Sequence, residues 1–487
     1  MNAKCSALLV AMAATFLFTS CSGPKNRGGG GGGNGEATLS VTLAAVPLTP
    51  PPGTSILSFV VTINSVSLTP SAGGSDVAIG LNSGSYAVDL TRLQSDSAFL
   101  GVASANVPSG TYNKLTVGIT GVVVTYCTVT SGTPGCKSGS VAQFTTGAGA
   151  PTTSNFSLTL AGNQQAALRV QINFNNALTV NSGTQAVTKV DLTAANVVTT
   201  LALPPAASSL SSGQLDFIED VTGIVTAASS SSVTVQTATR GTLTSSISSS
   251  TIGGTSCVIP TMTSCSSPAV GQVASFDAAL NADGSSSMLL YDPISSTSVD
   301  LIEGIDTNLN ASSTQFQIVT NEIVRASSGS LIGSLNLGDI VNVTLNNPRP
   351  FVIDSQGLPE SGNFLGLTSA TDILPGQTVA LHVTNFTAKS GSSPASATVD
   401  IVVLRFTRVA GSVSGPAGLT FNIGSLPPFF GQNGSNQVQL SSGTHTTNID
   451  GYTSVNNIAT GDNVSIRALF FGTGSVPTFS AAKVRKN

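Results

Sequence analysis

Residues 57–68, with the sequence LSFVVTINSVSL, show the pattern that decides the fold of this chain. From Leu57 to Ile63 every second residue is large and apolar, and the residues between are smaller or polar. This period of two is typical of a half-buried β-strand. The alternation resumes one residue out of phase from Val66 to Leu68, and such a slip is what a β-bulge produces. The stretch therefore predicts a long strand with a bulge at residues 64–65.

The same alternation recurs through the N-terminal half of the chain. Further runs occupy residues 115–119, 122–126, 156–160, 168–174 and 190–192. Gly, Asn, Ser and Pro separate the runs, which is typical of antiparallel sheets. Helical periodicity is almost absent, and residues 90–100 hold at most one or two helical turns. We therefore predict an all-β protein in which residues 37–204 form an antiparallel β-sandwich.

Residues 107–112, VPSGTY, predict the turn that leads into a sandwich strand. Pro108 fixes its own φ angle, and Gly110 permits a positive φ. Tyr112 can pack its ring on the sheet while its hydroxyl bonds to the backbone at the corner. Over residues 37–205 the chain resembles the bacterial domain of unknown function 4382, through this motif and through Asp89, Leu90, Leu93, Phe99, Leu100, Lys114 and Leu115. The resemblance implies an exported, often lipid-anchored protein, and it brings no catalytic residue.

Beyond a Ser-rich linker at residues 205–213, a two-part pattern occurs three times. Its first part is an apolar residue, a variable residue and a glycine that begins a strand, and these glycines are Gly223, Gly304 and Gly411. Its second part is a turn glycine that opens another strand, and these glycines are Gly271, Gly376 and Gly461. Three copies in the same order predict three similar units.

We expect each unit to be a small β-barrel-like repeat, at residues 214–297, 298–406 and 407–487. The spacing between the first glycines is wider after the second copy, which predicts an insertion in the middle unit that includes residues 337–341. Each unit resembles a second bacterial family, domain of unknown function 5666, and this resemblance implies a small closed barrel. A closed barrel leaves no exposed sheet edge. This suits a chain that has few charged residues with which to protect such an edge from pairing with another chain.

The first 20 residues predict a bacterial lipoprotein signal peptide. Lys4 supplies the positive end, and the apolar stretch 7–18 is too short to span a bilayer. Residues 18–21, FTSC, resemble a lipobox, which implies that Cys21 carries lipid. Ser22 is not an inner-membrane retention signal of the Asp type, so the resemblance to lipoprotein sorting implies the outer membrane, with the protein facing the periplasm or the cell surface. The Gly-rich residues 21–36 then form a flexible tether. An ordinary signal peptide with a chance cysteine is the alternative.

Four further cysteines suggest disulfides, namely Cys127, Cys136, Cys257 and Cys265. Four cysteines allow three connectivities, and the close spacing within each pair favours two local loops. Metal binding is the alternative, but it needs four thiolates or nearby histidines, and neither His382 nor His445 is near these cysteines in the sequence. Disulfides indicate an oxidising compartment such as the periplasm or cell surface.

Charged residues are scarce, with 18 Lys plus Arg and 22 Asp plus Glu among 487 residues. Their share is 8%, where about 25% is usual. Clustered Lys and Arg are missing, so we expect no nucleic-acid partner. Two histidines and the lack of a G-x-S-x-G motif predict no catalytic residue, and we also expect no metal and no cofactor. Seven acids show no pairing that a glycosidase would need and are expected on the solvated surface: Asp216, Glu219, Asp220, Asp300, Glu303, Asp354 and Glu360.

Two remaining motifs could bind ligands. Residues 306–317 begin like a calcium loop but lack its glycine and its final glutamate, so a hairpin turn is expected there. The phenylalanines at 429–430 and 470–471 are expected to fill barrel interiors. We therefore expect a non-enzymatic, lipid-anchored cell-envelope protein with a binding or structural role. Its expected partners are the membrane, through the lipid, and a polysaccharide or envelope protein; a carbohydrate-binding or carbohydrate-active accessory protein is the alternative.

Overall fold

The computed structural model folds the described part of the chain almost entirely into β-strands, which confirms the predicted all-β class. The described residues are 35–81, 84–94, 98–99, 105–147, 149, 151–203, 214–254, 256–259, 263–265, 267–281, 283–307, 312, 314–346, 351–355, 358, 370–424, 426–430, 436–441, 444, 452, 454–473 and 476–487. Among them, the helical elements are short 3-10 turns: η1 (Arg92–Gln94), η2 (Ala370–Asp372), η3 (Pro428–Phe430) and η4 (Val455–Asn457). No helix in these ranges has the length and apolar character needed to cross a membrane.

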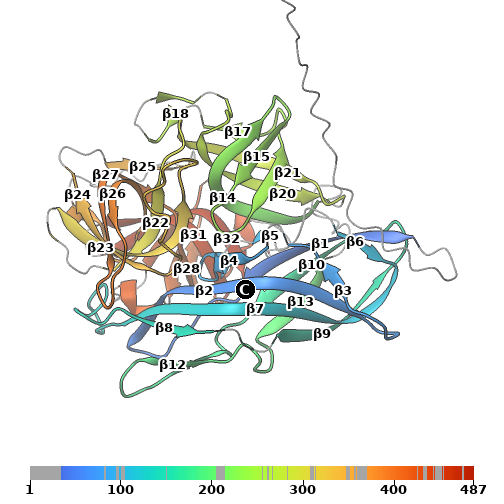
Figure 1. The fold of residues 1–487 in the computed structure, drawn as a ribbon. Coiled ribbons are helices and arrows are strands. Elements are labelled where there is room, and N and C mark those ends of the chain that lie inside the picture. The colour runs from blue at the N-terminus through green and yellow to red at the C-terminus, as the bar shows by residue number, and fades with distance from the viewer. Residues whose placement is uncertain are drawn as a thin grey trace, which may run out of the picture. The chain divides into compact units, whose positions relative to one another are not determined.

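The N-terminal domain is a sandwich of two sheets (Figure 1). Its strands are β1 (Glu36–Ala45), β2 (Thr54–Pro70), β3 (Val77–Ile79), β4 (Tyr86–Asp89), β5 (Ala98–Phe99), β6 (Ala105–Pro108), β7 (Gly110–Thr128), β8 (Ala142–Thr146), β9 (Thr152–Leu160), β10 (Gln165–Ile172), β11 (Leu178–Val180), β12 (Val187–Val190) and β13 (Val198–Leu203). One sheet has the order β3-β2-β7-β8, with β4 beside β2 and β9 beside β7. The other has the order β13-β10-β1, with β5 and β6 beside β1. A separate hairpin joins β11 and β12.

Side chains from both sheets share one hydrophobic core, in which the rings of Phe59 and Phe174 lie 4.9 Å apart. The predicted bulge is present, because the register of β2 on β7 shifts between Ile63 and Ser65. The predicted corner is present too, since the Tyr112 hydroxyl donates to the carbonyl oxygen of Pro108 at 2.6 Å. One pairing departs from the antiparallel expectation: β1 and β10 run parallel.

Three groups of strands follow the sandwich. The first comprises β14 (Gln214–Ala228), β15 (Ser232–Gln236), β16 (Thr242–Ser246), β17 (Ile252–Gly253), β18 (Ser256–Cys257), β19 (Thr263–Ser264), β20 (Val273–Asn281) and β21 (Ser286–Ser295). The second comprises β22 (Leu301–Asp306), β23 (Gln315–Val324), β24 (Ile340–Leu345), β25 (Phe351–Ile353), β26 (Thr378–Thr387) and β27 (Ala395–Arg405). The third comprises β28 (Thr407–Ala417), β29 (Thr420–Gly424), β30 (Asn436–Gln439), β31 (Asn463–Thr473) and β32 (Val476–Lys486).

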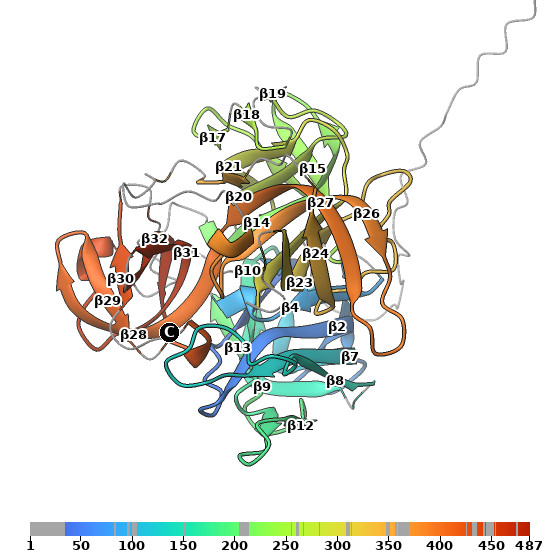
Figure 2. The same cartoon turned by 90° about the vertical axis from the view of Figure 1, so that its left-hand side faces the viewer.

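Each group forms a five-stranded barrel of the same topology. In the third, the ring is β28-β29-β30-β32-β31, and β30 runs parallel to β32 (Figure 2). The second closes in the same way through parallel β24 and β27, and the first through parallel β16 and β21. The five principal strands of each group therefore have the order 1-2-3-5-4. This is the order of the oligonucleotide/oligosaccharide-binding fold, a Greek-key barrel.

The repeated glycines occupy equivalent places in the three barrels. A Cβ atom at Gly223 or Gly411 would lie 2.2 Å from a carbonyl oxygen of the neighbouring strand, and one at Gly304 would lie 2.5 Å from such an oxygen. The first glycine thus permits the first and second strands to approach closely. The second glycine of each pattern has a φ angle of 89° to 91°, a left-handed conformation that favours glycine.

The insertion in the middle barrel precedes its third strand. Residues 325–339 connect β23 to β24, and Ile332 and Leu335 bury their side chains in the core of this barrel. The carbonyl oxygen of Gly338 accepts hydrogen bonds from Thr125 and Gln143 of the sandwich, both at 2.6 Å. The insertion therefore also fastens the second barrel to the sandwich.

Candidate functional site

A cluster of buried charges lies where the sandwich and the three barrels meet. Its centre is Asp220 on β14 of the first barrel, which is 2% exposed. The Asp220 carboxylate pairs with Arg92 of the sandwich at 2.7 Å and with Arg405 of the second barrel at 3.1 Å. It also pairs with Arg408 of the third barrel. One carboxylate thus connects all four domains.

Carboxylates surround Arg405, at the end of β27. Its Nε atom lies 3.3 Å from Glu303, and its Nη1 atom lies 3.3 Å from Asp292 and also contacts Asp354. Glu303 pairs in turn with Arg92 at 2.5 Å. All five side chains are buried, so each charge is compensated by a protein group instead of by water.

Two further buried ion pairs extend the cluster. The Nη2 atom of Arg467 lies 2.8 Å from Oδ2 of Asp277, and Arg240 pairs with Glu322. Asp277 also accepts the backbone N–H of Asp220 at 2.7 Å. This second carboxylate therefore holds the backbone of the central one.

The backbone and the charge of Asp220 are both unusual. Its φ angle is 54°, in the left-handed region that non-glycine residues seldom occupy, and it sits where the register of β14 on β20 shifts. Burial alone would raise the pKa of its carboxyl, but the positive charges of Arg92, Arg408 and Arg405 outweigh burial and hold this pKa well below its ordinary value. Asp220 is therefore ionised throughout the neutral range.

The burial of these acids overturns a prediction from the sequence. Asp220, Asp300, Glu303 and Asp354 are predicted on the solvated surface, and the prediction is wrong because all four are buried. The physical reason is that arginines compensate three of them: Asp220 and Glu303 pair with arginines of other domains, and Asp354 pairs with Arg405 of its own barrel. Sequence spacing does not reveal those partners. The side chains of Asp216 and Glu219, and residue 360, lie outside the described part of the chain.

Asp300 has a different structural role from the other buried acids. Its carboxylate accepts the backbone N–H groups of Ala326 and Leu331 and the hydroxyl of Ser330, at distances of 2.6 to 2.7 Å. These three residues belong to the insertion of the second barrel. Asp300 therefore fixes the insertion to the first strand of that barrel.

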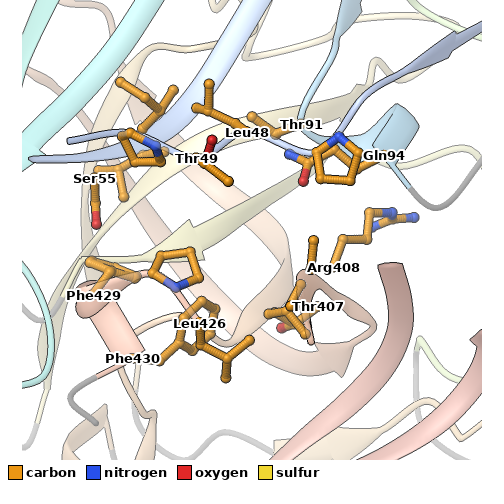
Figure 3. A pocket seen from close by; sticks show the side chains of 18 of the residues that line it. Leu48, Thr49, Ser55, Thr91, Gln94, Thr407, Arg408, Leu426, Phe429 and Phe430 are labelled. Atoms are coloured by element: carbon orange, nitrogen blue, oxygen red, sulfur yellow. The ribbon is translucent and has the colours of Figure 1, made fainter. Parts of the chain in front are cut away.

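A pocket of about 460 Å³ lies beside the charge cluster. Figure 3 shows Leu48, Thr49, Thr91 and Gln94 of the sandwich along one wall, and Thr407, Leu426, Phe429 and Phe430 of the third barrel along the opposite wall. Ile305, Asn321 and Thr378 add a contribution from the second barrel. Arg92 and Arg408 line the pocket as well as the cluster. The volume falls within the roughly 300–1,000 Å³ that is typical of small-molecule sites.

The aromatic wall of the pocket is held by close packing. Phe430 meets the rings of Phe429 and Phe470 edge-on, with centroids 5.8 and 5.6 Å apart. A Cβ atom at Gly376 would lie 2.4 Å from the Phe430 ring, so the glycine makes room for this ring. The phenylalanines at 429, 430 and 470 are buried in the core cluster of the third barrel, as expected, but the first two also line the pocket.

Two residues of the pocket lining each have a buried polar atom without a hydrogen-bond partner in the protein. The atoms are Oγ of Ser55, on β2, and Oδ1 of Asn321, on β23. Ser55 is 2% exposed and Asn321 is 7% exposed. Asn321 is the extra residue of a bulge, because Glu303 pairs with Glu322 while Gly304 pairs with Thr320. The protein itself covers both atoms, so neither is offered to a molecule in the pocket.

The described residues that line the pocket include no Asp or Glu. The nearby carboxylates of Asp220 and Glu303 are instead engaged by arginines. The pocket thus offers an apolar wall, hydroxyl and amide groups, and guanidinium groups that are already paired. This set can hold a ligand, but it does not supply the two facing carboxylates of a glycosidase.

Two disulfides are present, Cys127–Cys136 and Cys257–Cys265, and both close local loops. The first loop reaches the pocket wall. The backbone N–H of Gly135 donates to the carbonyl oxygen of Phe429 at 2.8 Å, and that of Cys136 donates to Thr307 of the second barrel at 3.0 Å. The sandwich therefore holds the aromatic wall through a cross-linked loop.

Several predicted sites lie elsewhere. Cys21, which is predicted to carry lipid, and His445 lie outside the described residues, as do residues 308–311 of the calcium-like motif. His382 is half-buried on β26, where its Nδ1 atom lies 2.6 Å from Oδ1 of Asp400. Across the described ranges, no group of three or more His, Cys, Asp or Glu residues is placed to hold a metal ion.

The sequence gives little indication of the pocket or the cluster. Arg92 follows Asp89-Leu90 within the resemblance to domain of unknown function 4382, but nothing in the pattern separates it from a surface arginine. Arg405 and Arg408 lie on either side of the junction between the second and third units. This position is the signal in the sequence that could point to their role in the cluster. Ser55 carries no signal, because serine is common throughout this chain.

Two comparisons with known proteins bear on this architecture. No curated protein matches the chain. Residues 37–202, which cover the sandwich, match the model of a family described as a domain of unknown function, DUF4382.

Proposed function

We propose that this protein is a lipid-anchored, non-enzymatic binding protein of the cell envelope that takes a small ligand in the pocket between the sandwich and the third barrel. The observation that carries the proposal is the pocket itself, with its apolar wall and its hydroxyl and amide groups. The charge cluster supports a binding role, because it fixes the domains that form the walls. The outer membrane, with the protein facing the periplasm or the cell surface, is the proposed location.

The lipid anchor is the part of the proposal that rests on residues 18–21 and the following glycines. Its test is a Cys21→Ala change, or globomycin treatment, followed by fractionation of membranes. We expect the change to block lipid-dependent maturation and to release the protein from the membrane fraction. Unchanged partitioning into the membrane would contradict the anchor.

The binding role is tested with N-phenyl-1-naphthylamine, a neutral dye whose fluorescence rises in apolar surroundings. The chain is produced with Cys21→Ala, so that it carries no lipid and needs no detergent. Ala410 lines the pocket, and Ala410→Trp should fill it and abolish the fluorescence rise. Ala417, exposed on the same strand, provides the control Ala417→Trp, which should bind as the parent chain does. No dye binding to the parent chain would contradict the proposal.

Carbohydrate binding is the second candidate function. The observation that favours it is the strand order of the three barrels, since barrels of this topology commonly bind oligosaccharides or oligonucleotides. Fold alone does not establish function, so this candidate rests on analogy. A glycan array separates the two candidate functions. Sugar binding that persists in Ala410→Trp would favour a carbohydrate-binding protein whose site is not the pocket.

We also propose that the three barrels belong to domain of unknown function 5666. The equivalent glycines support this assignment, because Gly223, Gly304 and Gly411 all permit the same close approach of strands. A barrel family that has the first and second glycines of the pattern at the same places would be under the same steric constraint.

A further inference from the structure

We infer that the first and third barrels pair through the same patch of each barrel, and that opposite charges at two repeated positions select this pairing among the three barrels. Neither the pairing nor its charges depend on the proposed binding function. The positions follow from the repeated two-glycine pattern and from the ion pairs of the charge cluster.

Two positions of the repeated pattern carry the charges. The first lies three residues before the first glycine, and it is occupied in the three barrels by Asp220, Leu301 and Arg408. The second lies six residues after the second glycine, and it is occupied by Asp277, His382 and Arg467. In the second and third barrels the two positions are opposite each other on paired strands. In the first barrel the N–H of Asp220 donates to Asp277, so the two positions form one patch in every barrel.

The patch lies on the outside of the barrel. In the third barrel, the residues next to the two arginines along their strands bury their side chains in the core: Val409, Ile466 and Ala468. Successive side chains of a strand point to opposite faces, so Arg408 and Arg467 point out of this barrel. Asp277 points out of the first barrel for the same reason, because its neighbours Phe276 and Ala278 belong to the core of that barrel.

Equivalent positions of the first and third barrels face each other. Asp220 pairs with Arg408, and both residues precede the first glycine of the pattern by three positions. Asp277 pairs with Arg467, through Nη2 to Oδ2 at 2.8 Å and through Nη1 to Oδ1 at 3.3 Å. The four side chains are at most 7% exposed. A patch that meets its own equivalent is the geometry of an isologous dimer, here with acids in one half and bases in the other.

The patch of the second barrel has no buried acid at either position. Leu301 lies in an apolar cluster that includes residues of the first barrel. His382 pairs with Asp400 of its own barrel. If the third barrel met this patch instead, its two arginines would be buried without a counter-charge, which is strongly unfavourable. The charges therefore favour the observed pairing and also disfavour the alternative.

Exchange of the charges of Asp277 and Arg467 tests this selection. The chain is produced with Cys21→Ala, so that it carries no lipid, and its unfolding is measured in urea. Asp277→Arg or Arg467→Asp alone places two like charges together in a buried site. Each should raise the unfolding equilibrium constant at a fixed urea concentration by at least about a hundredfold. The double exchange restores an opposite pair, so it should recover at least about tenfold relative to either single variant.

The equivalent position of the second barrel provides the matched control. Asp277→Arg combined with His382→Asp adds an acid at the same place in the pattern, but on the barrel that does not supply the partner of Asp277. We expect no recovery relative to Asp277→Arg alone. His382→Asp by itself measures the cost of the added acid, which is subtracted.

Recovery in the exchange and not in the control supports selection by charge. Equal recovery in both would overturn it, because net charge and not the facing pair would then decide stability. If the exchange recovers nothing, Asp277→Asn and Arg467→Gln are measured singly and together, since these smaller changes introduce no new charge. A double variant that costs less than the sum of the two single variants supports the pairing, and costs that simply add overturn it.

Discussion

The guanidinium group of Arg92, on the sandwich, lies 2.7 Å from the carboxylate of Asp220, on the first barrel, and both side chains are buried. The two residues are 128 positions apart in the sequence. Two more arginines reach the same carboxylate from the other barrels. In a chain with 8% charged residues, buried charges are concentrated where the domains meet. We expect this junction to control both the stability of the assembly and the shape of the pocket beside it.

Asp220→Asn should destabilise the protein by about 3–5 kcal/mol, because it leaves buried arginines without their shared counter-charge. The free energy of unfolding is measured by urea denaturation. Asp191→Asn is the control, since Asp191 pairs with Lys189 on the surface and its loss should leave the urea midpoint unchanged. A small effect at Asp220, similar to that at Asp191, would show that the cluster does not hold the domains together.

Acid should weaken the assembly through the same carboxylate. The folded-state pKa of Asp220 is lowered, so its contribution to stability is present above the unfolded value of about 3.9 and is lost as the pH falls through the folded value. We therefore expect the urea midpoint to decline below about pH 4. The decline should be shallower in Asp220→Asn, and equal slopes in the two proteins would contradict the assignment.

Gly223→Ala should destabilise the first barrel by about 1–3 kcal/mol, because the new methyl group would meet a carbonyl oxygen of β15 at 2.2 Å. Gly253→Ala is the control, since no atom lies within 4 Å of the position its methyl group would take. Thermal unfolding of the two variants makes the comparison. Equal melting temperatures would show that the repeated glycine is not needed for barrel closure.

Removing the Cys127–Cys136 disulfide should loosen the pocket wall, because its loop donates a hydrogen bond to Phe429. The change is Cys127→Ser with Cys136→Ser, and the measurement is binding of N-phenyl-1-naphthylamine. We expect weaker binding and a loss of about 2.5 kcal/mol of stability.

The second disulfide is a matched control for the first. The Cys257–Cys265 loop is one residue shorter, so its removal should cost a similar amount of stability. It lies outside the pocket lining, and dye binding should therefore be unchanged. Equal binding losses in both double variants would point to general loosening instead of a role for the first loop.

Local patterns in the sequence predict much of the fold. The slip after Ile63 predicts the bulge of β2, and Tyr112 forms the predicted corner with Pro108. These features depend on neighbours along the chain or on the period of a strand, so they are visible without the fold. The parallel pairing of β1 with β10 has no such local cause and is not predicted.

The candidate site depends on contacts that local patterns do not encode. The sequence predicts Asp220 and Glu303 on the surface, because an isolated acid is normally solvated. Their burial depends on arginines that the packing of four domains brings together. The pocket is likewise formed by walls from different domains, and Ser55 and Asn321 are 266 positions apart.

The sequence by itself determined the all-β class, the repeating units and their turn glycines, since alternation and backbone conformation act over a few residues. Only the tertiary structure decided that each unit is a barrel of order 1-2-3-5-4, that scarce charges gather at the domain junction, and that a pocket opens beside them. The physical reason is the distance along the chain over which each effect acts. Hydrophobic alternation is a local property, whereas compensation of a buried charge requires a partner whose position is set by the packing of whole domains.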